Sequence, residues 1–409
     1  MASDVRFNPL YPFSWYQHML THHPIYYHKK QKQWHLFRYQ DVKEALRNHQ
    51  LFQQDAREET SSPLESSLVM LSPPKHGQMR SLISQAFTPK AVQQLQPRIR
   101  EIARTLLEEV KESGSMDLVE SFSYPLPVIV IAELLGIPKE DREQFKKWSD
   151  HIVESTELDD LDMSDASGRI WKWPKKAVRQ IRIIQRFRRA EKEMGAYFLE
   201  IIRERKKNPK ADLISQLIRA EVEGEKLTDF ELLGFCMLLL IAGNETTTNL
   251  INNVVLCMDQ FPHVQEHVAQ HPTDIRKVVE ETLRYRAPVP TLSRIAGEDV
   301  DVRGYRIKKG ERVILWLGAA NHDSTQFPRP HDFNWNRTNH KHMAFGHGIH
   351  FCLGAPLARL EAEIALRELF LHCSHIRIQS NAKLQPNIMH SVDRLPVLFY
   401  RRQAPCERI

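Results

Sequence analysis

Apolar positions near the end of the chain recur three and four residues apart, which is the spacing of one face of an α-helix. The pattern begins at about Ala355 and continues to about residue 370. Pro356 fits the first turn of this helix, where its missing N–H costs nothing. The apolar positions are Leu357, Leu360, Ile364, Leu366, Leu369 and Phe370.

A second pattern predicts the longest helix of the chain, from a cap at Thr228 to about Phe261. Glu231 stands three residues after Thr228, which completes a capping box. About 33 residues at 1.5 Å each would span about 50 Å. Near the middle, the segment 240–248 breaks an apolar run with a glycine, an acid and three threonines. Such a local conflict is typical of functional sites.

Shorter patterns predict the remaining elements. Prolines make residues 1–24 irregular, and Asp41 is expected to cap a helix over residues 42–46. Two further helices are expected at about 91–112 and 125–135. Alternating residues predict short strands at 25–28, 34–38, 300–302, 305–307, 312–316, 376–378 and 397–400. The fold class that follows is mainly α with small peripheral β-sheets.

Composition and charge place the chain among ordinary globular proteins. It has 409 residues, of which 42% are hydrophobic and 26% are charged. The net charge of +6 is too modest to indicate nucleic acid, but it suits an acidic protein partner. The apolar run from Leu232 to Ala242 is too short to span a bilayer. No signal peptide is visible, and the five cysteines form no disulfide framework, so we expect a cytoplasmic protein.

Charge is unevenly distributed in one region. Residues 154–165 carry six acids, and residues 167–190 carry nine Lys or Arg and no acid. The interpretation we favour is a solvated helix neutralised by the acidic stretch before it. A basic amphipathic helix at a membrane surface, or an anchor for a substrate carboxylate, are the alternatives.

The candidate chemistry centres on residues 345–354, which read Phe-Gly-His-Gly-Ile-His-Phe-Cys-Leu-Gly. Gly346 and Gly348 allow a tight turn and a close approach to a flat ligand. Cys352 stands just before the predicted helix start, where unpaired N–H groups and the helix dipole lower the pKa of a thiol. This setting suits a thiolate that binds a metal, although a buried cysteine in a glycine-rich turn is the simpler alternative.

This stretch resembles the haem-binding signature of the cytochrome P450 family, Phe-Gly-x-Gly-x-His-x-Cys-x-Gly, and every fixed position is filled. The resemblance implies that haem b is the cofactor and that Cys352 is the axial ligand of its iron. It also implies that Phe345, Gly346, His350 and Gly354 contact the haem.

Two further motifs are similar to those of the family. The segment from Ala242 and Gly243 to Glu245 and Thr246 resembles its oxygen-binding groove, where small residues leave space above the iron. The resemblance implies that Glu245 and Thr246 pass protons to bound O₂. A kinked helix with hydroxyls bonded to its own backbone is the alternative for this segment.

Three cations match residues that hold haem propionates in the family. His76 and Arg80 stand four apart, so a helix would place both on one face. A solvated helix face is the alternative for this pair. Arg294 matches a third such residue.

Glu281 and Arg284 stand three apart and match the Glu-x-x-Arg motif of the family. The expected third partner is Arg337, in a loop that leads to Cys352. A surface ion pair is the general alternative. We assign these residues a structural role and no chemistry.

The resemblance implies a single domain over residues 1–409 that works as a haem-thiolate monooxygenase and uses O₂ as cosubstrate. No nucleotide-binding fingerprint is present, so electrons from NAD(P)H are expected to arrive through a ferredoxin or flavodoxin and its reductase. The expected substrate is a mid-sized apolar molecule, such as a fatty acid, terpenoid or steroid. The residues expected to line its pocket are Leu68, Leu239, Ala242, Val289, Leu292, Ile388 and Met389.

Three other functions stay open at this point. A peroxide-driven hydroxylase is disfavoured by Glu245 and Thr246, which suit proton delivery to O₂. A non-catalytic haem sensor would need no such residues. A zinc protein is conceivable because four histidines lie close to the cysteine in sequence, although the glycines suit a flat cofactor better. These residues are His340, His342, His347, His350 and Cys352.

Overall fold

The computed structural model describes residues 7–8, 10–54, 62–64, 66–110, 113–156, 173–379 and 392–401. The chain divides into two compact units, which we describe separately. Unit 1 comprises Met1–Ala56, Pro89–Pro127 and Glu245–Ile409, and unit 2 comprises Arg57–Thr88 and Val128–Asn244. The single domain expected from the sequence stays a prediction.

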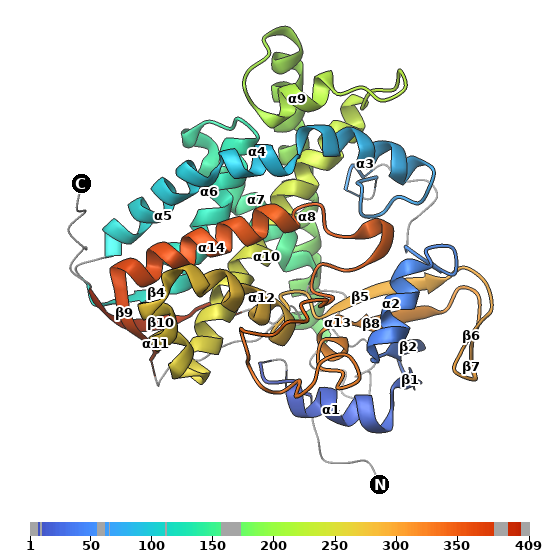
Figure 1. Ribbon diagram of the computed structural model, residues 1–409. Helices are drawn as coiled ribbons and strands as arrows, with labels where there is room; N and C mark the ends of the chain where they lie inside the picture. Colours follow the sequence, from blue (N-terminus) through green and yellow to red (C-terminus); the bar gives the residue numbers. More distant parts are fainter. Residues whose placement is uncertain are drawn as a thin grey trace. The chain divides into compact units, whose positions relative to one another are not determined.

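Helices dominate both units (Figure 1). Unit 1 contains α1 (Phe13–His22), α2 (Tyr39–Arg47), α4 (Pro89–Gln94), α5 (Gln96–Val110), α11 (Pro262–Gln270), α12 (Ile275–Tyr285), α13 (Leu317–Ala320) and α14 (Ala355–His372). Unit 2 contains α3 (Lys75–Ala86), α7 (Arg142–Thr156), α8 (Trp173–Lys207) and α9 (Leu213–Arg219). Two helices pass from one unit into the other, α6 (Pro125–Leu134) and α10 (Asp229–Gln260).

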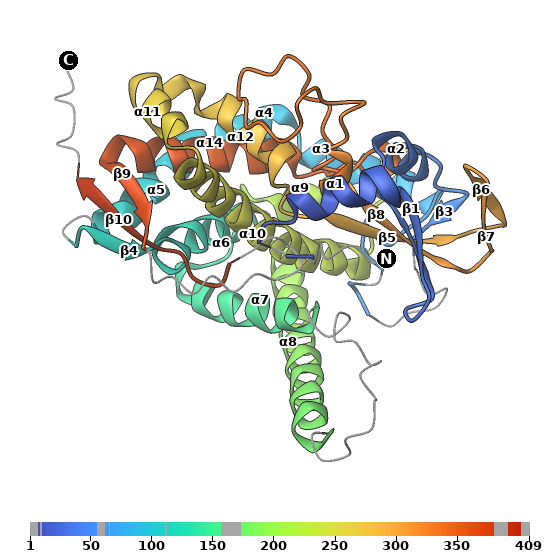
Figure 2. The same cartoon turned by 90° about the horizontal axis from the view of Figure 1, so that it is seen from below.

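The strands described all belong to unit 1 and form small sheets. The largest has the order β1 (Ile25–His28), β2 (Gln33–Leu36), β8 (Arg312–Trp316), β5 (Thr291–Ala296) and β3 (Phe52–Gln53), with β2 and β8 parallel. A second sheet has the order β4 (Ser115–Asp117), β10 (Pro396–Arg401), β9 (Cys373–Ile378), and Figure 2 shows it near α5 and α14. A hairpin joins β6 (Val300–Val302) to β7 (Tyr305–Ile307). The fold is mainly α with small sheets, which confirms the predicted class.

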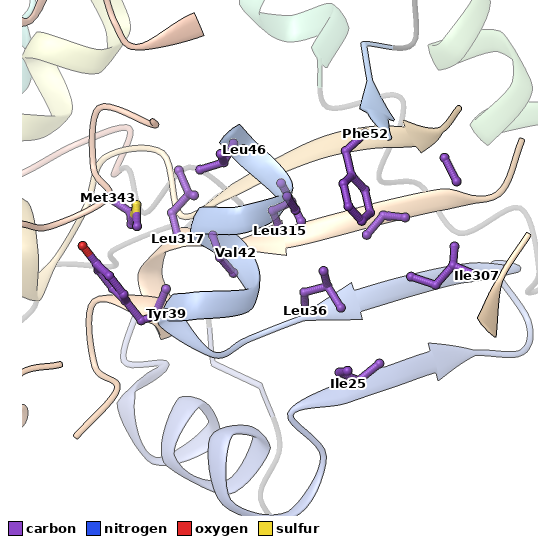
Figure 3. Close-up of a cluster of buried hydrophobic side chains, with 14 of the residues drawn as sticks. Ile25, Leu36, Tyr39, Val42, Leu46, Phe52, Ile307, Leu315, Leu317 and Met343 are labelled. Carbon is purple, nitrogen blue, oxygen red and sulfur yellow. The ribbon is translucent and has the colours of Figure 1, made fainter. Parts of the chain in front are cut away.

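One helix covers the five-stranded sheet and closes a hydrophobic core beneath the cysteine loop. Val42 and Leu46 stand four residues apart on α2, so both point to the sheet. Figure 3 shows them facing Leu36 and Leu315 of the parallel strands. Met343, two residues before the cysteine loop begins, belongs to the same core. The sheet core therefore fixes the start of the loop.

Several predicted boundaries were wrong, each for a local reason. Residues 13–22 are helical, because Pro12 stands at the N-cap of α1, a place where proline is tolerated. Asp41 does not cap α2. The helix begins at Tyr39, whose N–H donates at 2.9 Å to Asp323 from a distant part of the chain. The helix expected over 91–112 is two helices that break at Leu95.

The capping box of α10 is present, because Thr228 N donates to Glu231 Oε2 at 2.9 Å and Glu231 N donates to Thr228 Oγ1 at 3.2 Å. However, α10 is not the longest helix. It has 32 residues, whereas α8 has 35. Sequence patterns missed the length of α8 because the apolar stripe in its basic half is weak.

A buried carboxylate holds the loop that leads to the cysteine. Glu281 on α12 is fully buried and accepts from Arg284 Nε at 2.9 Å and Nη2 at 2.8 Å. It also accepts from Arg337 Nε at 3.0 Å and from the backbone N–H of Asn334 at 2.9 Å. The two guanidinium groups in turn donate to carbonyls of the same loop, among them that of Asp332. A surface ion pair is therefore the wrong description of this cluster.

We predict that Arg284→Met lowers the free energy of unfolding by about 3–5 kcal/mol, because Glu281 would stay buried without its main partner. Urea unfolding midpoints of variant and wild type measure the change. Arg306→Met is the matched control, because Arg306 pairs with Asp299 at 3.1 Å on the surface and is worth under about 1 kcal/mol. Equal losses in the two variants would contradict the prediction.

Candidate functional site

The cysteine loop is closed by its own backbone. Cys352 N donates to the carbonyl of Phe345 at 2.9 Å, and Phe351 N donates to that of Gly348 at 3.1 Å. Gly346 and Gly348 have φ of 72° and 73°, which side-chain-bearing residues rarely adopt. A Cβ on Gly348 would stand 2.6 Å from the carbonyl oxygen of Leu46 on α2. The loop conformation therefore requires these glycines.

Cys352 differs from the other cysteines that the structure describes. Its side chain is exposed, whereas Cys236, Cys257 and Cys373 are buried. Burial raises the pKa of the Cys236 and Cys257 thiols well above their ordinary value, so both stay protonated. Gly354 is the N-cap of α14, which places Cys352 at the start of that helix as the sequence predicted. An accessible thiolate at a helix start suits a metal ligand.

The middle of α10 presents an accessible stripe. Most of this helix is buried, yet Leu239, Gly243 and Thr246 are half-buried and Ala242 is exposed. These four positions follow the i, i+3, i+4, i+7 spacing, so they lie on one helix face. The sequence named all four as site residues. Glu245, beside this stripe, is also half-buried.

Helix packing accounts for part of the motif. A Cβ on Gly243 would clash with Ile131 of α6, so the helices approach as closely as glycine allows. The glycine is therefore needed for packing as well as for the space that the resemblance implies.

Sequence reasoning missed Glu361 on α14. Its carboxyl is fully buried, burial raises its pKa well above the ordinary value, and the hydroxyl of Thr247 bonds to it. Burial therefore favours the protonated form of this carboxyl. The sequence did contain a signal for this buried acid. Glu361 stands beside Leu360 and three residues before Ile364, on the helix face predicted to be apolar.

Arg294 on β5 has the properties of a residue that binds an anion. Its side chain is buried, and burial lowers its pKa to about 10. It donates to the carbonyl of Ser293 at 2.7 Å and to Gln54 Oε1 at 3.3 Å. In the described part of the chain no carboxylate lies within ion-pair distance of it. A buried cation in this state would be stabilised by a carboxylate ligand.

His76 and Arg80 lie in unit 2, both on α3. His76 is buried and Arg80 is half-buried, so a solvated helix face is the wrong description of His76.

The residues expected to line a substrate pocket have mixed environments. In unit 2, Leu68 is buried and Leu239 is half-buried. In unit 1, Val289 and Leu292 are half-buried, and Leu292 also packs against the sheet core. Ile388 and Met389 lie outside the described residues.

The basic segment coincides with the start of α8 in unit 2. Its described cations are exposed, among them Arg182 and Arg188, whereas Ile183 and Ala190 are buried. A cleft of about 560 Å³ lies there between α7 and α8. Arg189 pairs at 2.7 Å with Glu193, whose Oε2 accepts from the Trp148 indole at 3.1 Å. Other lining residues are Gln144, Lys147, His151, Arg186 and Ala190. Most of the acidic stretch 154–165 lies outside the described residues.

The histidines near Cys352 do not form a metal site. Within the ranges described, no three His, Cys, Asp or Glu side chains are placed to hold an ion together. His342 Nε2 lies 3.2 Å from Glu280 Oε2. The pKa of His347 is lowered by burial and by the nearby cations Lys43 and Arg47, which would also repel Zn²⁺.

One described helix, α10, is long and apolar enough by composition to cross a membrane. Half of its most apolar window is buried inside the protein. A core helix meets the same two criteria, so this observation carries little weight.

Comparison with known proteins identifies the class. The model of the cytochrome P450 family matches residues 6–272 and 273–397. Cytochrome P450 109 of Bacillus spizizenii is 42% identical over 95% of this chain and 92% of its own. The crystal structure of substrate-free CYP109E1 from Bacillus megaterium has a TM-score of 0.88 and 39% identity, and covers 97% of this chain and 100% of that one.

Two similar structures contain ligands. The complex of CYP109E1 with testosterone has a TM-score of 0.83 and 40% identity, covering 95% of this chain and 99% of that one. P450BioI in complex with hexadec-9Z-enoic acid ligated acyl carrier protein has a TM-score of 0.83 and 34% identity, covering 95% and 97%.

The chain belongs to the cytochrome P450 family. It is an oxidoreductase, a monooxygenase that uses haem and O₂. The residues present fit the cofactor, because Cys352 is accessible, the glycine loop is tightly turned, and the buried Arg294 has no carboxylate partner among the described residues. The exposed stripe of α10 adds a surface of small and apolar residues.

Proposed function

We propose that Cys352 is the axial ligand of the haem iron and that the chain hydroxylates a mid-sized apolar substrate. The observation that carries the ligand assignment is the exposed thiol in a glycine-turned loop at the start of α14. When bound, haem supplies the oxidation, in which one oxygen atom of O₂ enters a C–H bond and the other leaves as water.

The other residues that would contact the haem belong to the cysteine loop, to α10 and to a set of buried or half-buried cations. Phe345, Gly346, His350 and Gly354 form the loop around the ligand, and Ala242 and Gly243 give the stripe of α10 its small side chains. His76, Arg80 and Arg294 would hold the propionates. The buried state of Arg294 supports this, because a carboxylate partner would offset the desolvation of a cation.

Proton delivery is assigned to α10. Thr246 Oγ1 would hold and pass a proton on the accessible stripe. Glu245, one residue earlier and half-buried, would resupply that proton as a general acid. This pair supports the use of O₂ with reductant over a peroxide-driven reaction.

Electrons would come from NAD(P)H through a reductase and a ferredoxin or flavodoxin. The net charge of +6 favours an acidic protein of this kind, because opposite charges speed association.

The substrate proposal rests on the apolar character of the stripe and of Leu68, Val289 and Leu292. A ligand of about 300 Å² could gain several kcal/mol from burial before the costs of binding, at about 25 cal/mol per Å². The relatives that bind testosterone or a hexadecenoyl chain agree with a steroid or a fatty acid. A terpenoid fits the same requirement.

Cys352→Ser tests the ligand. We predict that the variant loses the absorption band of the reduced carbon monoxide complex for which the family is named, because serine provides no thiolate. Cys373→Ser is the matched control, since that cysteine is buried, and it should keep the band. An unchanged band in Cys352→Ser would falsify the assignment.

Thr246→Ala tests proton delivery. The variant should bind haem and substrate but divert a larger share of reducing equivalents to peroxide, because the proton on Thr246 Oγ1 is lost. Product formed per NAD(P)H consumed measures this. Thr248→Ala is the control, because its hydroxyl bonds to the Ser123 carbonyl at 3.1 Å and is buried. Equal coupling in Thr246→Ala and wild type would contradict the role, and faster turnover with peroxide alone would favour the peroxide-driven alternative.

Spectral titration tests the substrate class. Fatty acids, terpenoids and steroids should shift the Soret band, because they can bury apolar surface near the iron, whereas small polar compounds should not. Shifts confined to the polar compounds would exclude an apolar pocket. Weaker fatty-acid binding at high salt, with steroid binding unchanged, would indicate that the cations of α8 anchor a carboxylate.

A further inference from the structure

The ring that opens the cysteine loop lies under a guanidinium group. The Arg359 Cζ stands 4.4 Å from the centroid of the Phe345 ring, well within the range of a cation–π contact. Arg359 belongs to α14, the helix that starts just after Cys352. The same stretch of chain thus supplies both the cysteine and the cation that covers the loop.

Arg359 is fixed in this position by an acid from another helix. Glu280 Oε1 accepts from Arg359 Nε at 2.5 Å, and Glu280 Oε2 accepts from Nη2 at 3.3 Å. Two bonds from one carboxylate fix the plane of a guanidinium group, which a single ammonium could not do. A side chain that is 33% exposed would otherwise sample several rotamers.

A histidine completes the arrangement. His342 Nδ1 accepts from the backbone N–H of Ala344 at 3.3 Å, which leaves Nε2 to donate to Glu280 at 3.2 Å. Burial raises the pKa of Glu280, but hydrogen bonds from His342 and Arg359 outweigh it and lower the pKa to about 2. Glu280 is therefore charged at neutral pH, which favours its pairing with Arg359.

The connection from this cluster to Cys352 is short. Phe345, under Arg359, accepts through its carbonyl from Cys352 N at 2.9 Å. A shift of the Phe345 backbone would therefore change the orientation of the cysteine. Glu280 also precedes Glu281 on α12, so adjacent acids hold the incoming loop and the cysteine loop.

We propose that Glu280 and His342 hold Arg359 against Phe345, and that this brace positions Cys352 and fixes a guanidinium group over the first ring of the cysteine loop. Arg359 is thus a positioning residue. The cation favours the added electron of ferrous haem, because an opposite charge lowers the energy of the more negative state. This inference rests on the proposed role of Cys352, and the tests below separate the two.

Arg359→Met removes the charge and the stacking together. At a fixed electrode potential we expect about a tenfold increase in the ferric-to-ferrous ratio, or about 59 mV for a one-electron couple. Arg367→Met is the matched control, because it removes one positive charge eight residues further along α14, about 12 Å away. We expect it to change the ratio less than twofold. Equal shifts in both variants would overturn the proposal.

Arg359→Lys separates charge from geometry. The ammonium keeps the charge but cannot form the paired bonds to Glu280 or stack on the ring. We expect the lysine variant to recover only part of the loss in reduction potential caused by Arg359→Met. Complete recovery with lysine would show that charge alone acts, and the brace would be refuted.

Amide hydrogen exchange provides a readout that needs no redox chemistry. The Cys352 N–H should exchange at least tenfold faster in Arg359→Met than in wild type, because its bond to Phe345 loosens. The Glu281–Asn334 bond should keep its protection, which shows that the variant is folded. Unchanged exchange at Cys352 would contradict the brace even if Cys352 is the ligand. Conversely, a carbon monoxide band retained by Cys352→Ser would refute the ligand and leave the exchange result standing.

Discussion

The buried charge of Glu281 is the interaction on which unit 1 depends. A carboxylate at 0% exposure is tolerated only when its oxygens are fully bonded, and four donors meet this one. Two of them come from Arg284, one turn away on the same helix, and two come from a loop about fifty residues later. The loop has little regular structure of its own, so its path is set by polar contacts with α12. If the loop took a path that removed Asn334 and Arg337 from Glu281, the buried carboxylate would lose two of its four donors.

Between the Glu281 cluster and Cys352, a series of contacts along the chain fixes the path of the backbone. Asn321 Oδ1 accepts from Met343 N at 2.7 Å, and the Met343 side chain enters the sheet core. Gly346 N then donates to the Met343 carbonyl at 2.8 Å, and the loop turns back so that Cys352 meets Phe345. Each step uses a different kind of force: a buried ion pair, an apolar side chain, and finally glycine backbone freedom. The thiol ends in a defined place although it belongs to no helix or strand.

The sequence predicted the parts of this arrangement that are local. The helix after Cys352, the capping box at Thr228 and the short strands at 305–307 and 312–316 all follow from spacing within a few residues, and the structure shows each of them. Sequence patterns could not predict contacts between residues that lie far apart along the chain. The start of α2 depends on a hydrogen bond to Asp323, which lies far along the chain, and no local sequence pattern predicts this bond. Phe345 was recognisable as a motif residue, but its contact with Arg359 depends on how Glu280 packs.

Glu361 shows why the sequence predicted only some of the acidic residues near the middle of α10. The sequence placed Glu245 and Thr246 by resemblance, and an acid on an apolar helix face passed unnoticed. In the structure its carboxyl is buried beside Thr247, the neighbour of Thr246, and burial raises its pKa and so favours its protonated form. Glu245 is instead half-buried. Two acids near consecutive threonines of one helix thus lie in different surroundings, because Glu361 is buried beside Thr247 whereas Glu245 is half-buried. Helical geometry produces this contrast, because adjacent positions point about 100° apart and meet different surroundings.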